Sequence, residues 1–161
     1  MKFIISALLL LICGCAFNST RENKLPAEAA AAFHAPDNVV LYSLEPWSQP
    51  TTSDATLQNV KILGQTTLDA KQAVIAIAAF EAAIPPRVSR TAAHALCFDP
   101  RHALEVTAHG QTYDFLLCYA CGYLYVYRGD ENIAMLDARG SPDVLNALLT
   151  AAKVPLSKSN E

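Results

Sequence analysis

Hydrophobic and polar residues alternate along much of this chain in the way that predicts strands of a half-buried sheet. The runs are rich in β-branched and aromatic residues, and turn-forming residues separate them. The predicted strands cover residues 38–44, 60–65, 91–98, 102–107, 112–118, 124–127 and 133–136. Gly64, in the second of these strands, allows a β-bulge.

Two segments change to helical spacing. Apolar positions from about residue 68 to residue 83 cover one broad face, Thr66 or Thr67 is expected to cap this helix, and a proline pair ends it. A second helix is predicted after Ser141, which precedes a proline suited to the first turn, and it ends near residue 154. This order predicts an α+β fold, with an antiparallel β-meander sheet and two helices packed on one face.

One hairpin has a register that can be predicted from its turn. If His109 and the following glycine form a two-residue loop, Leu104 faces Phe115 across the strands. The same register places Glu105 opposite Asp114. Two carboxylates in direct opposition cost some stability unless a cation bridges them, so solvated carboxylates in a slightly different register are the alternative.

The first residues are typical of an export signal. Met1-Lys2 is followed by an apolar stretch at 3–12, which is shorter than the roughly 20 residues needed to span a bilayer. The sequence Ile12-Cys13-Gly14-Cys15 then resembles a bacterial lipobox, with an aliphatic residue three positions before the cysteine and a small residue directly before it. We therefore expect residues 1–14 to be a lipoprotein signal peptide and Cys15 to be the lipidated, palmitate-bearing residue. An ordinary cleaved secretory signal is the alternative.

The lipobox resemblance implies where the protein is located and how its chain is organised. Ala16, and not aspartate, follows the modified cysteine, which by this resemblance favours the outer membrane, with the protein facing the periplasm. Residues 15–37 are expected to form a lipid-anchored flexible tether containing a short alanine-rich helical turn. Residues 38–156 form the single α+β domain, and residues 157–161 a disordered tail.

Composition narrows the class of partner. The chain has 161 residues, 17% of them charged, with a net charge of −3 and no cluster of basic residues. A nucleic-acid partner is therefore not expected. The sequence also lacks a phosphate-cradling glycine loop and the usual hydrolase motifs, so an enzyme is less expected than a binding protein.

Three cysteines and a histidine carry the candidate chemistry. Cys97, His102, Cys118 and Cys121 form a donor set by type for tetrahedral zinc, the expected cofactor if there is one. In a regular strand Cys118 and Cys121 would point to opposite faces, so they can share a bond or a metal only if the chain bends between them, which Gly122 allows. Under the hairpin register, His102 falls on the apolar face, opposite Cys118.

Three alternatives stay open for these cysteines. The first is a structural disulfide or buried free thiols, and the second is the zinc site. The third is redox chemistry at Cys118 and Cys121, although a strand and not a helix follows that pair, so no helix dipole activates a thiolate there.

The run Cys97-Phe98-Asp99-Pro100-Arg101-His102 and the later Cys118-Tyr119-Ala120-Cys121 resemble a motif pair in a family of small bacterial envelope proteins. In that family a Cys-Phe-x-Pro-Arg-His turn precedes a Cys-aromatic-x-Cys motif. The resemblance implies no activity. It does imply that the motif residues lie together in space, and it makes Arg101 a candidate binding residue.

These observations predict an outer-membrane-anchored periplasmic lipoprotein that acts as a binding or structural accessory. Its expected partners are the membrane, through the lipid, and an envelope protein or small ligand. The alternatives are a Cys/His zinc domain and a thiol–disulfide redox protein using Cys118 and Cys121.

Overall fold

The structure is a computed structural model, which describes residues 20–89 and 97–158. The predicted signal peptide and the predicted lipidation site at Cys15 therefore lie outside the described residues. The strands are β1 (Thr20–Glu22), β2 (Asn38–Glu45), β3 (Thr56–Leu57), β4 (Val60–Thr67), β5 (Arg87–Ser89), β6 (His102–Ala108), β7 (Gln111–Cys118), β8 (Tyr123–Arg128) and β9 (Glu131–Asp137). The helices are α1 (Ala27–His34), α2 (Ala70–Ala82) and α3 (Asp143–Ala151).

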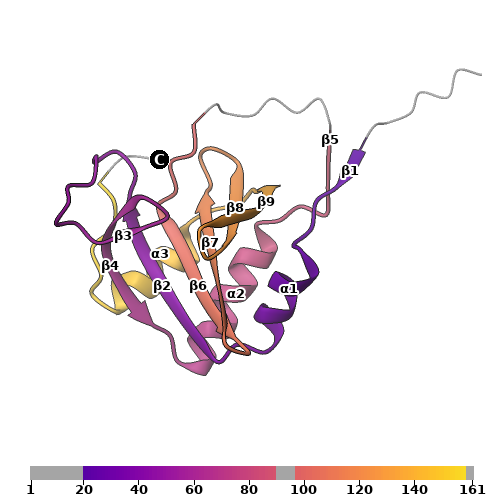
Figure 1. The fold of residues 1–161 in the computed structure, drawn as a ribbon, viewed down its shortest axis with the longest axis horizontal. Helices are drawn as coiled ribbons and strands as arrows, with labels where there is room; N and C mark the ends of the chain where they lie inside the picture. The colour runs from indigo at the N-terminus through magenta and orange to yellow at the C-terminus, as the bar shows by residue number, and fades with distance from the viewer. Residues whose placement is uncertain (1–19, 90–96, 159–161) are drawn as a thin grey trace, which may run out of the picture.

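Seven strands form one antiparallel sheet in the order β3-β4-β2-β6-β7-β8-β9, and β1 pairs separately with β5. Four consecutive strands, β6 to β9, are neighbours in sequence and in space, which is a meander. The predicted α+β class with an antiparallel meander is thus confirmed. Figure 1 shows this sheet with the helices gathered on one side of it.

The side of the sheet that the helices cover is the helix face, and it holds the main core. Strand residues such as Leu41, Leu104 and Phe115 are fully buried there against Phe80 of α2 and Leu145 of α3. The predicted register across the β6–β7 turn is confirmed, because Leu104 pairs with Phe115. His109 and Gly110 both take positive φ, at 51° and 75°, as the tight two-residue turn requires.

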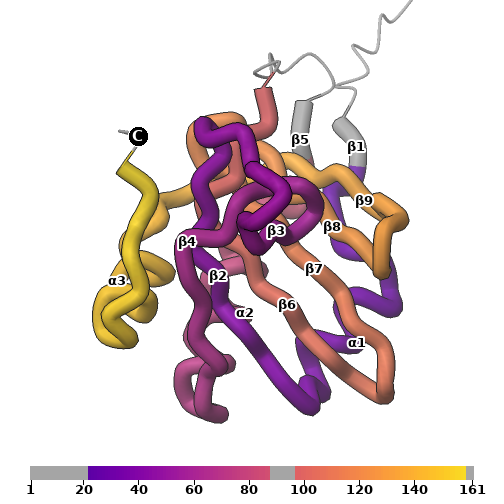
Figure 2. The backbone as a smooth tube through the Cα atoms, turned by 60° about the vertical axis from the view of Figure 1, so that its left-hand side comes forward, coloured from indigo at the N-terminus to yellow at the C-terminus, as the bar shows by residue number. Residues whose placement is uncertain are grey.

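A third helix joins the two expected ones on the helix face. Helix α1 lies within the range expected as a tether, yet its Ala29 and Ala32 are buried and Phe33 stacks on Phe115 with ring centroids 4.3 Å apart. Small alanine side chains let α1 approach the sheet closely. The packed part of the chain therefore begins before residue 38, and Figure 2 shows α1 lying beside the meander strands.

The opposite side of the sheet is the outer face, and it carries a smaller buried cluster. Its members are Val40, Tyr42, Leu44, Ala103 and Leu116. Partly exposed side chains from β3, β4 and the loop before β6 complete it. Gln58, in the β3–β4 turn, donates hydrogen bonds to Asp114 of β7 at 2.8 Å and to the carbonyl of Gly129 at 2.9 Å. These bonds draw the β3–β4 hairpin across the outer face.

Two local predictions need correction. Helix α2 is capped by Asp69, not by Thr66 or Thr67, because β4 keeps pairing with β2 through Thr67. The Asp69 carboxylate accepts the Gln72 amide at 2.8 Å, and the Gln72 side chain accepts the Asp69 amide at 3.0 Å. The strand predicted at 91–98 lies mostly outside the described residues, and its last two residues belong to an irregular segment.

Candidate functional site

The β7–β8 turn brings Cys118 and Cys121 together. Gly122, at a φ of 76°, donates its amide to the carbonyls of Cys118 at 3.0 Å and Tyr119 at 3.2 Å, which bends the chain back on itself. The Cα atoms of the two cysteines lie 5.2 Å apart, and their sulfurs form a disulfide. The bend that the spacing required is therefore present, and a glycine supplies it.

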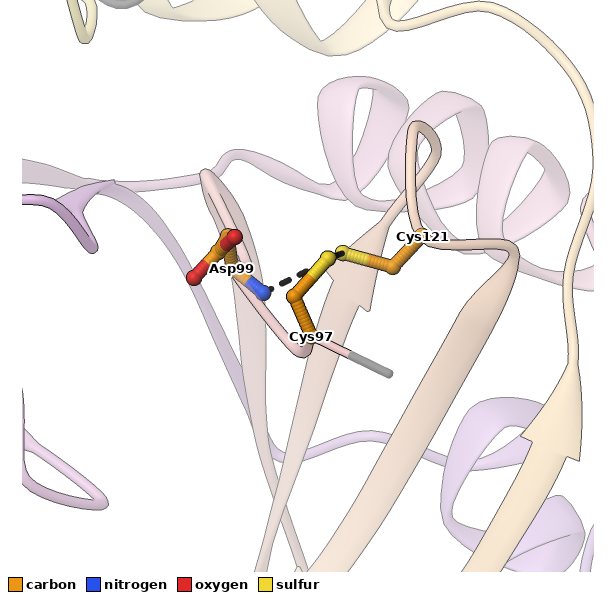
Figure 3. A group of neighbouring side chains, drawn as sticks. All are labelled: Cys97, Asp99 and Cys121. Atoms are coloured by element: carbon orange, nitrogen blue, oxygen red, sulfur yellow. Dashed lines mark hydrogen bonds between the residues drawn. The ribbon is translucent and has the colours of Figure 1, made fainter. Parts of the chain in front are cut away.

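Cys97 places a third sulfur beside this disulfide. Its Sγ lies 3.9 Å from the Sγ of Cys121, and Figure 3 shows the two side chains pointing toward one another. Cys97 is exposed, whereas Cys118 and Cys121 are only 3% and 4% exposed. We call these three residues the cysteine cluster. One face of it is open to solvent, and that opening is at Cys97.

The irregular segment at residues 97–101 is held in place by packing and by the backbone. Phe98 stacks on Tyr125 of β8, with ring centroids 3.7 Å apart and an interplanar angle of 8°. The carbonyl of Arg101 accepts the amide of Leu44 at 2.9 Å, which joins the end of the segment to β2. These contacts fix the segment over the outer face and hold Cys97 at the β7–β8 turn.

Two backbone amides point at the sulfurs of the disulfide. The amide of Asp99 donates to Cys121 Sγ at 3.2 Å, drawn as the dashed line in Figure 3, and the amide of Cys121 donates to Cys118 Sγ at 3.0 Å. A disulfide sulfur is a weak acceptor, while a thiolate accepts strongly because it carries charge. Both donors therefore suit the reduced form of the cluster.

His102 does not join the cysteine cluster. It faces the helix face, as predicted, and its Nε2 lies 2.8 Å from Oδ1 of Asn146 on α3. Its side chain is 3% exposed, and burial, followed by the positive charge of Arg101, lowers its pKa, with the Asn146 hydrogen bond acting against this shift. Buried and hydrogen-bonded to a helix side chain, the imidazole packs in the core here. Among the described residues, His102 is not one of the ligating groups that lie together at Cys97 and Cys121.

A different donor set lies at the cluster. Among the described residues, the ligating atoms of Cys97, Asp99 and Cys121 all lie within 4.8 Å of one another. Asp99 is not among the candidate ligands that the sequence indicated, because a carboxylate followed by proline is typical of a turn. Its place in the Asp-Pro turn directly after Cys97 was the only signal that could have marked it.

A groove of about 530 Å³ is found at a second place, between α1 and α2. Its walls are mostly apolar and include Phe33, Val39, Val74 and Ile77. Val74 is 68% exposed at its rim. No cysteine lines the groove, so it is separate from the cysteine cluster.

The fold and the cluster define an α+β domain with a thiol beside a disulfide. Searches of protein families, curated proteins and solved structures give no significant match to this chain. In the part of the chain that the structure describes, no helix has the length and apolar character needed to cross a bilayer.

Proposed function

We propose that this domain is a thiol–disulfide exchange protein of the cell envelope. The observation that carries the proposal is the 3.9 Å separation between Cys97 Sγ and Cys121 Sγ, because Cys121 is the near end of a disulfide. Thiol–disulfide exchange proceeds by attack of a thiolate on a disulfide sulfur, so a nucleophile and its target are already in contact.

The internal exchange step conserves atoms and electrons. The Cys97 thiolate forms a bond to Cys121 Sγ, the bond between Cys121 and Cys118 breaks, and its electron pair passes to Cys118 as a thiolate. The amide of Cys121, 3.0 Å from Cys118 Sγ, donates to that leaving thiolate. A fixed donor aimed at the developing negative charge favours the step.

The exposure of Cys97 gives an external thiol a route to the buried disulfide. An external thiol reaches the buried Cys118–Cys121 bond poorly but reaches Cys97 directly. After the internal step, Cys97 is part of the disulfide and an external thiolate attacks it, forming a mixed disulfide. Cys97 is thus the residue through which the buried pair exchanges with a partner.

The proposed location rests on the first residues of the chain. A lipid on Cys15 anchors the domain to the outer membrane, facing the periplasm, an oxidising compartment in which disulfides persist. Radiolabelled palmitate incorporated by the native chain and lost in Cys15→Ser tests this part of the proposal. Label retained in Cys15→Ser would contradict it.

The exchange itself is tested by the rate at which glutathione reduces the Cys118–Cys121 disulfide in the full chain. We expect Cys97→Ser to slow reduction about tenfold or more, because the exposed route is lost. Thr67→Ser, an exposed change on β4, is the matched control and should leave the rate unchanged.

An unchanged rate in Cys97→Ser would contradict the exchange proposal. The cysteine cluster would then only stabilise the fold. The protein would more readily be explained as a binding or structural accessory that works with an envelope protein or small ligand. Mapping the glutathione adduct by peptide mass spectrometry gives a second readout, and we expect the adduct on Cys97.

A further inference from the structure

We propose that the reduced cysteine cluster binds one zinc-class divalent ion through Cys97, Cys118 and Cys121, with Asp99 as the fourth ligand. This inference rests on the proposed exchange function, because the disulfide must first be opened. An external dithiol supplies the two electrons and two protons that open it and becomes a disulfide itself. The ion then displaces the protons of the three thiols.

The spacing of the sulfurs suits a shared metal. A tetrahedral zinc with Zn–S bonds of about 2.3 Å places its sulfurs about 3.8 Å apart. Cys97 and Cys121 already lie 3.9 Å apart, and Asp99 offers an oxygen within 4.8 Å of both sulfurs. Cys118 Sγ, released from its bond, needs only to move away from Cys121 Sγ to the same separation.

The backbone around the sulfurs also suits a metal–thiolate site. Cys118 and Cys121 have the two-residue spacing of a zinc knuckle, and Gly122 closes the turn at positive φ. The amides of Asp99 and Cys121 donate to the sulfurs of Cys121 and Cys118. Such outer hydrogen bonds orient thiolate ligands and stabilise their charge.

Charge explains why the reduced cluster needs a cation. Three thiolates and a carboxylate in such close proximity repel one another, so they must either remain protonated or share a positive ion. Thiolates select zinc or monovalent copper over magnesium and calcium. A carboxylate as the fourth donor makes a tetrahedral set with three sulfurs and one oxygen, which favours the divalent ion.

This set differs from the zinc set that the sequence offered as one alternative, because Asp99 takes the place of His102. The imidazole is on the helix face and is hydrogen-bonded to Asn146. The two sets make opposite predictions for two substitutions. Asp99→Asn should weaken metal binding, and His102→Gln should leave it unchanged.

The test is a titration of the full chain with Co²⁺, followed by its displacement with Zn²⁺. The chain carries Cys13→Ser and Cys15→Ser, so that the cysteine cluster holds its only thiols. The chain is reduced with a phosphine, which adds no thiol of its own. We then expect one bound Co²⁺ per chain, with the d–d absorption bands of tetrahedral cobalt and a thiolate-to-cobalt charge-transfer band. The oxidised chain should give none of these signals.

Variants then identify the ligands. Cys97→Ser should lose one thiolate's share of the charge-transfer intensity, and Asp99→Asn should weaken affinity about tenfold or more, as loss of one ligand does. A reduced chain that binds no Co²⁺, or one whose binding needs His102 but not Asp99, would overturn the site. Circular dichroism of each variant separates ligand loss from unfolding.

The failure of this inference can be distinguished from failure of the exchange function. The glutathione assay on Cys97→Ser is carried out without metal. The Co²⁺ titration starts from chemically reduced protein and so does not depend on exchange. Exchange without metal binding would overturn only the metal site. Metal binding without exchange would overturn the exchange function and show that the cluster is a metal site in its reduced form alone.

Discussion

The two faces of the sheet differ in how much apolar core they bury and in the polar groups that lie on them. Among the residues that the structure describes, the helix face buries a continuous core of 23 residues under three helices, and His102 on this face is hydrogen-bonded to Asn146. The outer face buries a cluster of five, and beside it lie opposed carboxylates and the segment that holds Cys97. Most of the buried apolar core therefore lies on one face, and the proposed exchange site lies on the other.

Adjacent leucines on β7 provide the sharpest test of this division. Leu117 is fully buried on the helix face, and Leu116 is 1% exposed on the outer face. Each Leu→Ala change should destabilise by about 2–5 kcal/mol, with Leu117→Ala toward the upper end, because core packed on both sides relaxes less around a cavity. Urea unfolding of both variants measures the difference. A larger loss in Leu116→Ala would contradict the division.

The pair of His102 and Asn146 ties the start of β6 to α3. Asn146→Ala should cost about 1–3 kcal/mol, because it leaves the buried imidazole without this partner. Asn146→Asp, which keeps an acceptor oxygen, is a control for the loss of volume. An unchanged urea midpoint in Asn146→Ala would show that the pair contributes nothing to stability.

The same imidazole predicts a pH dependence with a definite sign. Burial lowers the His102 pKa below its ordinary value of 6.5, so the unfolded chain takes up a proton first as the pH falls. Stability from this group is therefore present above pH 6.5 and is lost as the pH falls below it toward the lowered value. His102→Gln should flatten this dependence, measured as unfolding free energy against pH.

Substitutions of Phe98 test whether packing on the outer face positions Cys97 for exchange. The ring stack with Tyr125 contributes about 0.5–1.5 kcal/mol beyond the apolar area that it buries, so Phe98→Ala should destabilise by at least this amount. It should also slow glutathione reduction, because Cys97 is no longer held beside Cys121. Phe98→Leu keeps the apolar volume and is the matched control. A normal reduction rate in Phe98→Ala would show that the stack does not position Cys97.

The smallest effect is expected at the opposed carboxylates. Burial raises the pKa of Glu105, and the charge of Asp114 raises it further. Burial also raises the pKa of Asp114, although the hydrogen bond from Gln58 acts in the opposite direction. Their contribution is present at low pH and is lost as the pH rises through the raised values, which is the opposite sign to His102. Asp114→Asn should therefore stabilise at pH 7 by about 0.2–1 kcal/mol. A loss of stability there would contradict this sign.

Regular patterns explain why so much of the sheet could be predicted. A two-residue turn at His109-Gly110 leaves one register for β6 and β7, and that register fixes both the Leu104–Phe115 contact and the Glu105–Asp114 opposition. The bulge that Gly64 allows is also present, since the pairing with β2 shifts register between Gly64 and Ile62. The hairpin register depends on short-range geometry, which is why its turn residues were sufficient to predict it.

The parts that could not be predicted depend on contacts between distant segments. Residues 97–101 have no periodicity, so nothing in the sequence shows that Phe98 stacks on Tyr125 or that Asp99 lies beside Cys121. Ala29 and Ala32 of α1 have no strong hydrophobic signal, although both are buried. The partner of His102, on α3, is 44 residues away.

The measurement that tests the account most directly is disulfide mapping of Cys118→Ser in the full chain, exported under oxidising conditions. If Cys97 Sγ faces Cys121 Sγ as described, peptide mass spectrometry should recover Cys97 linked to Cys121. Cys121→Ser, which removes the sulfur that Cys97 contacts, is the control and should yield less linkage to Cys97. Recovery of Cys97 and Cys121 as unlinked thiols in Cys118→Ser would contradict the exchange mechanism.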